Sequence, residues 1–151
     1  MTTESDKPTE AALLKMLDLQ WQDHFQTRTQ TWKSLEMVAP MLVALIALDW
    51  SSKNPSTAYV AAILLMVAAG FGMAITLKHR NVEIQKFTTI QNLEDTLGFG
   101  SLVHNRKLPQ PISFQSIFNF RQSNTPLFIL RMHFIVFVFA LGFLVLRLLG
   151  Y

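Results

Sequence analysis

The sequence contains no cysteine and few charged residues, and both shortages narrow the class of protein. Without cysteine there are no disulfides, no thiolate chemistry and no cysteine-based metal site. Charged residues make up 15% of the 151 residues, below the roughly one quarter that is usual in soluble domains, while half are hydrophobic. This balance favours a membrane protein of one-domain length. The net charge of +3 is small, and we expect no nucleic-acid partner.

The N-terminal segment lacks the apolar core of a cleavable signal peptide, because its first ten residues are mostly polar. We expect residues 1–8 to form a disordered tail. The first hydrophobic segment would then direct insertion into the membrane.

Sequence signatures of catalysis are also missing. There is no phosphate-binding loop, no Rossmann glycine pattern and no nucleophile elbow. The acidic pair Glu94 and Asp95 has no partner base. The histidines do not pair at a metal-ligand spacing, and we expect them to be solvated or interfacial: His24, His79, His104 and His133. The sequence therefore predicts neither an enzyme nor a bound metal or cofactor.

Two uncharged apolar segments dominate the first half of the chain, at residues 37–48 and 58–77. A helix needs roughly 20 mainly apolar residues to cross a bilayer, which the second segment reaches and the first reaches if its helix begins near Ser34. Turn-forming residues fill positions 51–57 between them. The pattern predicts a transmembrane helical hairpin over residues 34–78.

An amphipathic helix is expected before the hairpin, over residues 9–35. Its apolar positions recur at helical spacing, with Arg28 set among them: Leu14, Leu17, Trp21, Phe25, Trp32 and Leu35. This helix either lies on the membrane or packs on other copies of the chain. The alternative is that it docks a cytoplasmic partner protein. If it continues into the first membrane helix, Pro40 would kink it.

Small residues recur four positions apart in the second membrane helix, and such pairs let helices approach closely in lipid. The candidates for helix packing are Ala58, Ala62, Ala68, Gly70, Gly72 and Ala74. The hairpin segments hold no charged residue, which argues against a proton pump or an ion-coupled transporter.

Residues 79–126 are expected to form a cytoplasmic helix, a loop and an interfacial helix. The first helix, about residues 80–97, would end at Gly98. After a polar loop, Ser113 would cap a short helix rich in phenylalanine, with Arg121 beside it. Aromatic residues next to a cation are typical of a segment in the membrane interface.

A third membrane-spanning helix is expected at residues 127–149, within the C-terminal segment 127–151. Arg131 and Arg147 lie near its two ends and can extend toward opposite interfaces. The alternative is a helix that packs along the outside of an assembly or re-enters the membrane from the same side. Lys and Arg before residue 34 and after residue 77 indicate a cytoplasmic N-terminus, an external hairpin turn and an external C-terminus.

The flanks of the hairpin resemble those of the small bacterial RipA-like and SLATT-like membrane proteins, which include the octameric accessory membrane protein of RNA-targeting CRISPR systems. The likeness covers about residues 20–99, with an Arg- and Gln-containing entry helix at residues 24–32. Its exit-helix pattern is matched by Asn81, Lys86, Phe87, Ile90, Leu93, Glu94 and Leu97. The apolar C-terminal segment departs from the soluble C-terminus expected of these proteins.

This resemblance implies a homo-oligomer in the bacterial inner membrane that forms a pore or perturbs the membrane, in phage defence. The alternative is a non-conducting scaffold or adaptor that docks a cytoplasmic protein through its N-terminal helix. Membrane lipid and further copies of the chain are the expected partners. The candidates for the oligomer interface are Trp21, Phe25, Arg28, Trp32, Ile84, Phe87, Ile90, Leu93 and Leu97.

Overall fold

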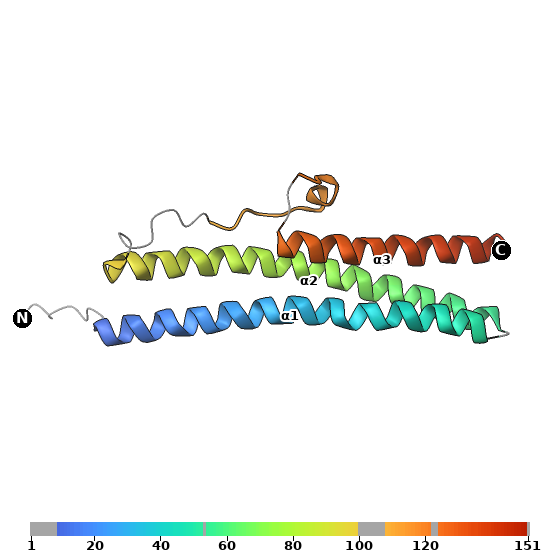
Figure 1. Cartoon of the computed structure of the whole chain (residues 1–151), viewed down its shortest axis with the longest axis horizontal. Helices are drawn as coiled ribbons and strands as arrows, with labels where there is room; N and C mark the ends of the chain where they lie inside the picture. The colour runs from blue at the N-terminus through green and yellow to red at the C-terminus, as the bar shows by residue number, and fades with distance from the viewer. Residues whose placement is uncertain (1–8, 53, 100–107, 122–123, 151) are drawn as a thin grey trace, which may run out of the picture. The chain divides into compact units, whose positions relative to one another are not determined.

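The computed structural model describes residues 9–52, 54–99, 108–121 and 124–150, and these contain helices but no strand. The helices are α1 (Glu10–Ser51), α2 (Pro55–Thr96), the short 3₁₀ helix η2 (Phe114–Phe118) and α3 (Thr125–Leu148) (Figure 1). Three of them, α1, α2 and α3, are long and apolar enough to cross a membrane. The expected all-α class is confirmed, and so is the expectation of three segments that could span a membrane.

In α1 the amphipathic segment runs on into the apolar segment, the alternative left open from the sequence, whereas in α2 the expected boundary near residue 78 is absent. Each of α1 and α2 is a continuous helix of 42 residues. Helix α1 continues through Pro40, and α2 continues through the polar residues 78–80. Lys and Arg are good helix formers, so a change from apolar to polar composition does not end a helix.

Helix ends follow local rules of capping. Before α2, the Asn54 side-chain oxygen accepts a hydrogen bond from the backbone N–H of Ser56 at 3.0 Å. The Asn124 side chain does the same for Leu127 at the start of α3, at 2.9 Å. Gly98 has φ +78° just after α2, as expected of the glycine that ends a helix.

The chain divides into two compact units, and the division falls inside α1 and α2. Unit one comprises Met1–Thr27 and Asn81–Pro111, and unit two comprises Arg28–Arg80 and Ile112–Tyr151. Unit one is therefore built mainly from the first part of α1 and the last part of α2. Unit two contains the apolar parts of both helices together with η2 and α3.

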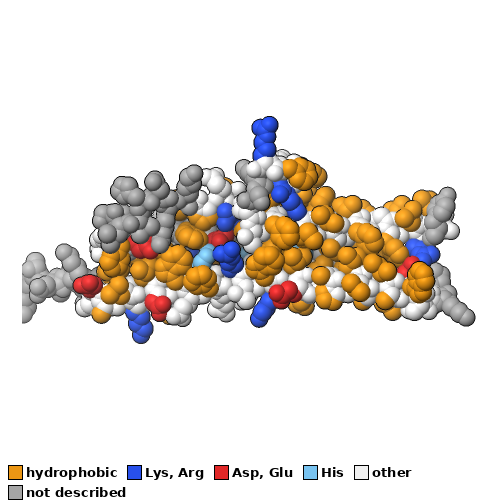
Figure 2. All heavy atoms as spheres, in the orientation of Figure 1, with side chains coloured by type: hydrophobic (Ala, Val, Ile, Leu, Met, Phe, Trp, Pro, Cys, Tyr) orange, Lys and Arg blue, Asp and Glu red, His pale blue; other side chains and the backbone are white. Residues whose placement is uncertain are grey.

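Unit two has an apolar core to which all three long helices contribute. Val38 and Leu45 come from α1, while Val136 and Ala140 come from α3. Between them lie the α2 residues Ala62, Leu65 and Ala69. Hydrophobic side chains also cover much of its visible outer face (Figure 2). Such a surface suits lipid rather than water.

The least exposed positions of α1 recur at alternating spacings of four and three, as in a coiled-coil seam. In the middle of this series the residues are polar rather than apolar, and they include His24, Thr27, Thr31 and Ser34. The stripe expected from the sequence only partly coincides with this seam, because Phe25 and Trp32 are exposed. Its other members are exposed or half-buried: Leu14 is exposed, and Leu17, Trp21 and Leu35 are half-buried. Polar residues can line this seam because its position depends on contact with α2, and polar side chains make such contacts as well as apolar ones.

Candidate functional site

Unit one carries a cluster of four rings contributed by α1 and α2. The Trp21 ring stacks on Phe25 with centroids 6.0 Å apart, and meets Phe87 edge-on at 5.9 Å. The His24 ring lies 4.8 Å from Phe87, also edge-on. Edge-to-face and offset aromatic pairs of this kind contribute roughly 0.5–1.5 kcal/mol beyond the area they bury. We call Trp21, His24, Phe25 and Phe87 the aromatic cluster.

The aromatic cluster is partly open to the outside. Phe25 belongs to this cluster, yet 58% of its surface is exposed. Along the same helix, Leu14 and Leu19 are also exposed. Unit one therefore leaves an aromatic and aliphatic surface on α1.

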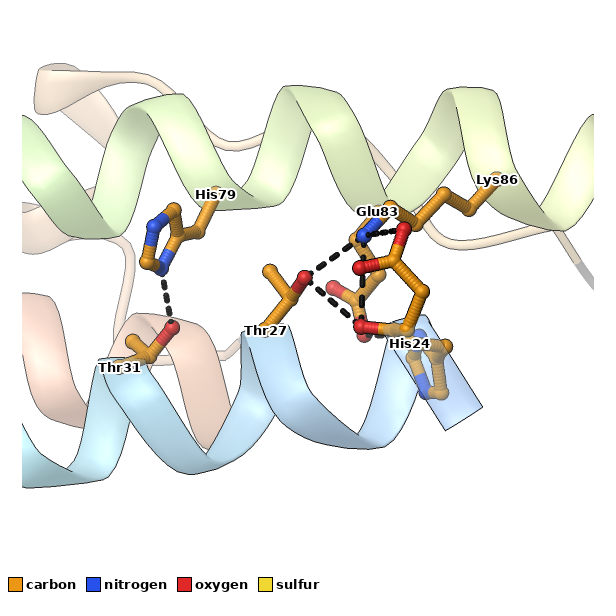
Figure 3. A network of polar contacts seen from close by, with 7 residues as sticks. His24, Thr27, Thr31, His79, Glu83 and Lys86 are labelled. Atoms are coloured by element: carbon orange, nitrogen blue, oxygen red, sulfur yellow. Dashed lines mark hydrogen bonds and ion pairs between the residues drawn. The ribbon is translucent and has the colours of Figure 1, made fainter. Parts of the chain in front are cut away.

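Polar contacts beside the aromatic cluster join α1 to α2 (Figure 3). The Lys86 ammonium lies 2.6 Å from the Asp23 carboxylate and donates to the Thr27 hydroxyl at 2.7 Å. The Glu83 carboxylate lies 4.0 Å from Nδ1 of His24. Lys86 is largely buried, so these contacts position the last part of α2 against α1 within unit one.

His24 is only 5% exposed, and His133 is completely buried. The expectation that all the histidines are solvated or interfacial was therefore wrong for these two. Each occupies a helix position that faces a neighbouring helix, which isolated sequence spacing does not reveal. His104 lies outside the described residues. His79, in unit two, forms a hydrogen bond of 2.8 Å with the Thr31 hydroxyl (Figure 3).

Some expected interface residues are buried by the chain itself. Ile90 has no exposed surface and Leu93 very little, so a second copy cannot contact the Ile90 side chain in this arrangement. Ile84, Phe87 and Leu97 are partly exposed. Arg28 is exposed, and the Trp32 ring lies 6.3 Å from that of Phe128 in unit two.

In unit two, His133 of α3 packs directly on Gly72 of α2. A Cβ placed on Gly72 would lie 2.1 Å from Nε2 of His133, far inside van der Waals contact. The Nδ1–H of His133 donates to the Ile129 carbonyl at 2.8 Å, while Nε2 has no hydrogen-bond partner among the described residues. Thr76, also buried, donates to the Gly72 carbonyl at 2.7 Å. Glycine at position 72 thus makes room for an imidazole ring.

The other small residues vary in exposure. Ala58 and Ala62 are buried, Ala68 and Gly70 are partly buried, and Ala74 is exposed. At Gly72 the close neighbour is a side chain rather than a helix backbone.

The two arginines of α3 bind protein groups. Arg147 pairs with the Asp49 carboxylate at the end of α1, and Tyr59 of α2 donates to the Arg147 carbonyl at 3.0 Å. Because the pair joins the C-terminal ends of α1 and α3, these two helices run in parallel within unit two. Arg131 binds two backbone carbonyls near η2.

Comparisons with known proteins find no match, either to a family model, to a curated protein or to a solved structure. The resemblance to the RipA-like and SLATT-like groups stays a prediction. In the part of the chain that the structure describes, no group of three or more His, Asp and Glu residues could hold a metal ion.

Sequence reasoning missed two pairs, Gly72 with His133 and Asp49 with Arg147. A signal for the second pair was present, because each residue is a charge near the end of an apolar segment. The first pair gave no such signal, since nothing in the sequence relates the two positions.

Proposed function

We propose that this chain is a membrane-anchored scaffold that assembles with further copies of itself through the aromatic cluster of unit one. The observation that carries the proposal is the exposed Phe25 ring stacked on Trp21. Large aromatic side chains dominate the binding energy of protein interfaces when a partner excludes water from them. Unit two would supply the membrane anchor.

Membrane anchoring is supported by three apolar helices of sufficient length. The parallel course of α1 and α3, joined by Asp49 and Arg147, places their C-terminal ends together within unit two. Lys and Arg are concentrated before residue 34 and after residue 77. By the positive-inside rule, we infer a cytoplasmic N-terminus and an external C-terminus.

A second copy of the chain is the occupant favoured for the exposed cluster. Copies embedded in one bilayer are held at the same height, so the same cytoplasmic residues of neighbouring copies meet. Closed rotational symmetry is the usual arrangement of identical subunits. Confinement to one plane also removes part of the orientational freedom that association in solution costs.

A scaffold is favoured over the pore expected from the family resemblance. Polar side chains of the apolar segments are bound within the chain, since Thr76 and His133 are fully buried and Arg147 is paired with Asp49. On the outer surface of these segments, side chains such as Val43, Leu64 and Phe71 are exposed. Copies packed in a ring would therefore line an opening with apolar groups, which water enters poorly.

Native mass spectrometry of the full chain in mild detergent tests the self-assembly. We expect the wild-type protein to form one discrete oligomer and Phe25→Ala to shift it toward monomer, with at least a tenfold weaker association, about 1.4 kcal/mol. Gln26→Ala changes the next, exposed residue and is the matched control, with the oligomer retained.

A monomeric wild-type protein, or a Phe25→Ala oligomer of unchanged stability, would overturn the assembly through this surface. Ion flux in liposomes made from the same preparation separates the scaffold from the pore. A scaffold leaves the ion gradient intact, and steady leakage through wild-type oligomers that Phe25→Ala abolishes would contradict it.

A further inference from the structure

The short helix η2 has one side packed on the core of unit two. Ile112 and Ile117 are buried in a cluster with Leu127 and Leu130 of α3. Met73 and Leu77 of α2 and Phe134 of α3 pack against this cluster. This side attaches η2 to the start of α3.

Arg131 fixes the C-terminal end of η2 to the second turn of α3. Its Nε donates to the Ile117 carbonyl at 3.1 Å, and a terminal nitrogen donates to the Asn119 carbonyl at 2.6 Å. The guanidinium carbon lies 5.2 Å from the centroid of the Phe120 ring, within the range of a cation–π contact. The Arg131 side chain thus contacts two carbonyls and one aromatic ring of residues 117–120.

Three phenylalanines in and just after η2 keep about half or more of their surface exposed. Phe114, Phe118 and Phe120 are 48%, 61% and 82% exposed. The rings of Phe114 and Phe118 meet Phe134 of α3 edge-on, at 5.7 and 5.6 Å. In Figure 2, hydrophobic and basic side chains lie together on this projecting part of the molecule. So much exposed aromatic surface in the seven residues 114–120 is unusual for a segment that faces water alone.

The position of these rings along α3 indicates what covers them. Phe134 is nine residues after the first residue of α3, which corresponds to roughly 13 Å along the helix axis. In a membrane that α3 crosses, rings in contact with Phe134 would therefore lie beside the hydrocarbon region rather than in water. Arg121 follows the phenylalanines and is exposed.

We propose that η2 is an interfacial anchor: Phe114, Phe118 and Phe120 insert beneath the headgroups of the leaflet that α3 enters, and Arg121 binds the phosphates of anionic headgroups. Amphipathic segments with aromatic residues on one side and cations beside them bind the boundary between headgroups and acyl chains. A cation beside a membrane-spanning helix is attracted to an anionic membrane surface. This inference is independent of self-assembly through the aromatic cluster.

Spin-label depth measurement on the full chain in liposomes tests the insertion. The chain has no cysteine, so Asn119→Cys labels one exposed position of the η2 segment while all three phenylalanines stay in place. Val138→Cys on the outer side of α3 marks the membrane, and Gln22→Cys on α1 marks the aqueous phase. We expect the Asn119 label to collide more with oxygen than with a water-soluble nickel chelate.

Two other patterns of access to the Asn119 label would each contradict the insertion. Free access of the nickel chelate to the Asn119 label would overturn the proposal in favour of a water-exposed segment. Exclusion of both agents would overturn it in favour of a protein contact, such as a second copy. Phe118→Gln combined with the label should increase nickel access, whereas Gln115→Asn on the same helix should not.

Lipid composition tests the part assigned to Arg121. We expect the label to move deeper when phosphatidylglycerol is added to phosphatidylcholine vesicles, and Arg121→Gln to abolish that shift while Arg121→Lys keeps it. Added inorganic phosphate should leave the depth unchanged. A shift that survives Arg121→Gln, or one that free phosphate reverses, would overturn the assignment to lipid headgroups.

Discussion

Gly72 illustrates how one side chain can determine the contact between two helices. Because the His133 ring fills the space where a Cβ would lie, an alanine there must displace a buried ring. Interiors tolerate such overpacking poorly, at a cost of typically 1–3 kcal/mol.

We therefore predict that Gly72→Ala lowers the stability of the detergent-solubilised protein by about 1–3 kcal/mol, measured by thermal unfolding. Gly70→Ala, two residues away, is the matched control, since no described atom lies within 4 Å of the added Cβ. Adding His133→Ala to Gly72→Ala should recover part of the loss. Equal effects of the two alanine substitutions would contradict this account of the contact.

The ion pair of Asp49 and Arg147 is the second prediction at the residue scale. Asp49→Asn and Arg147→Gln should each lower stability by on the order of 1 kcal/mol, and the double variant should cost less than the sum. Thermal unfolding of all four proteins measures the coupling. Strictly additive losses would mean that the pair does not connect α1 to α3.

At the scale of elements, the packing of α1 and α2 in unit one separates buried core residues from residues that a partner could contact. Ile90 is buried within the chain, whereas Phe25 on α1 is exposed beside Phe87. From the sequence, both Ile90 and Phe87 are candidates for the oligomer interface. The structure separates them, because only burial against the chain's own segments distinguishes a core residue from an interface residue.

We predict that Ile90→Ala destabilises unit one itself, by about 2–5 kcal/mol, the usual cost of truncating a buried isoleucine. Hydrogen exchange of peptides from residues 10–27 and 81–99 should then accelerate, whether the protein is assembled or not. Phe25→Ala should leave this exchange slow in the monomer. Unchanged exchange in Ile90→Ala would show that the residue does not stabilise this unit.

At the scale of the whole molecule, the membrane topology can be tested without background labelling, since the chain has no cysteine. With a cytoplasmic N-terminus, Asn54→Cys and Leu149→Cys should react with an impermeant maleimide added outside intact cells. Gln22→Cys should react only after the cells are opened. Labelling of Gln22→Cys in intact cells would reverse the orientation inferred from Lys and Arg.

Much of the architecture follows from composition and spacing. The apolar segments at residues 37–48 and 58–77 are uncharged, and segment 127–149 has its two arginines near its ends. Apolar segments of this kind determine which parts of the chain can enter lipid. Helix ends at Asn54, Gly98 and Asn124 are likewise local, because a cap depends on a few adjacent residues.

The continuity of the helices, and the side that each helix turns toward its neighbour, were harder to predict. The change to polar residues after Leu77 suggested a new helix, but a helix ends only where a cap or breaker replaces its hydrogen bonds. The stripe predicted for α1 follows its apolar residues, of which Phe25 and Trp32 are exposed, while the seam toward α2 is lined partly by His24, Thr27 and Thr31. Buried polar groups can satisfy each other across helices, so hydrophobicity alone does not identify the inner face.

The helical class, the three apolar segments and the approximate helix ends can be predicted from the sequence, because they depend on composition and on interactions between near neighbours. The contact of His133 with Gly72, the pair of Arg147 and Asp49, and the hydrogen bonds from Arg131 to the η2 segment are established by the folded arrangement. Those pairs join positions at least a dozen residues apart, and sequence spacing along one helix carries no information about which residue of another helix it will meet.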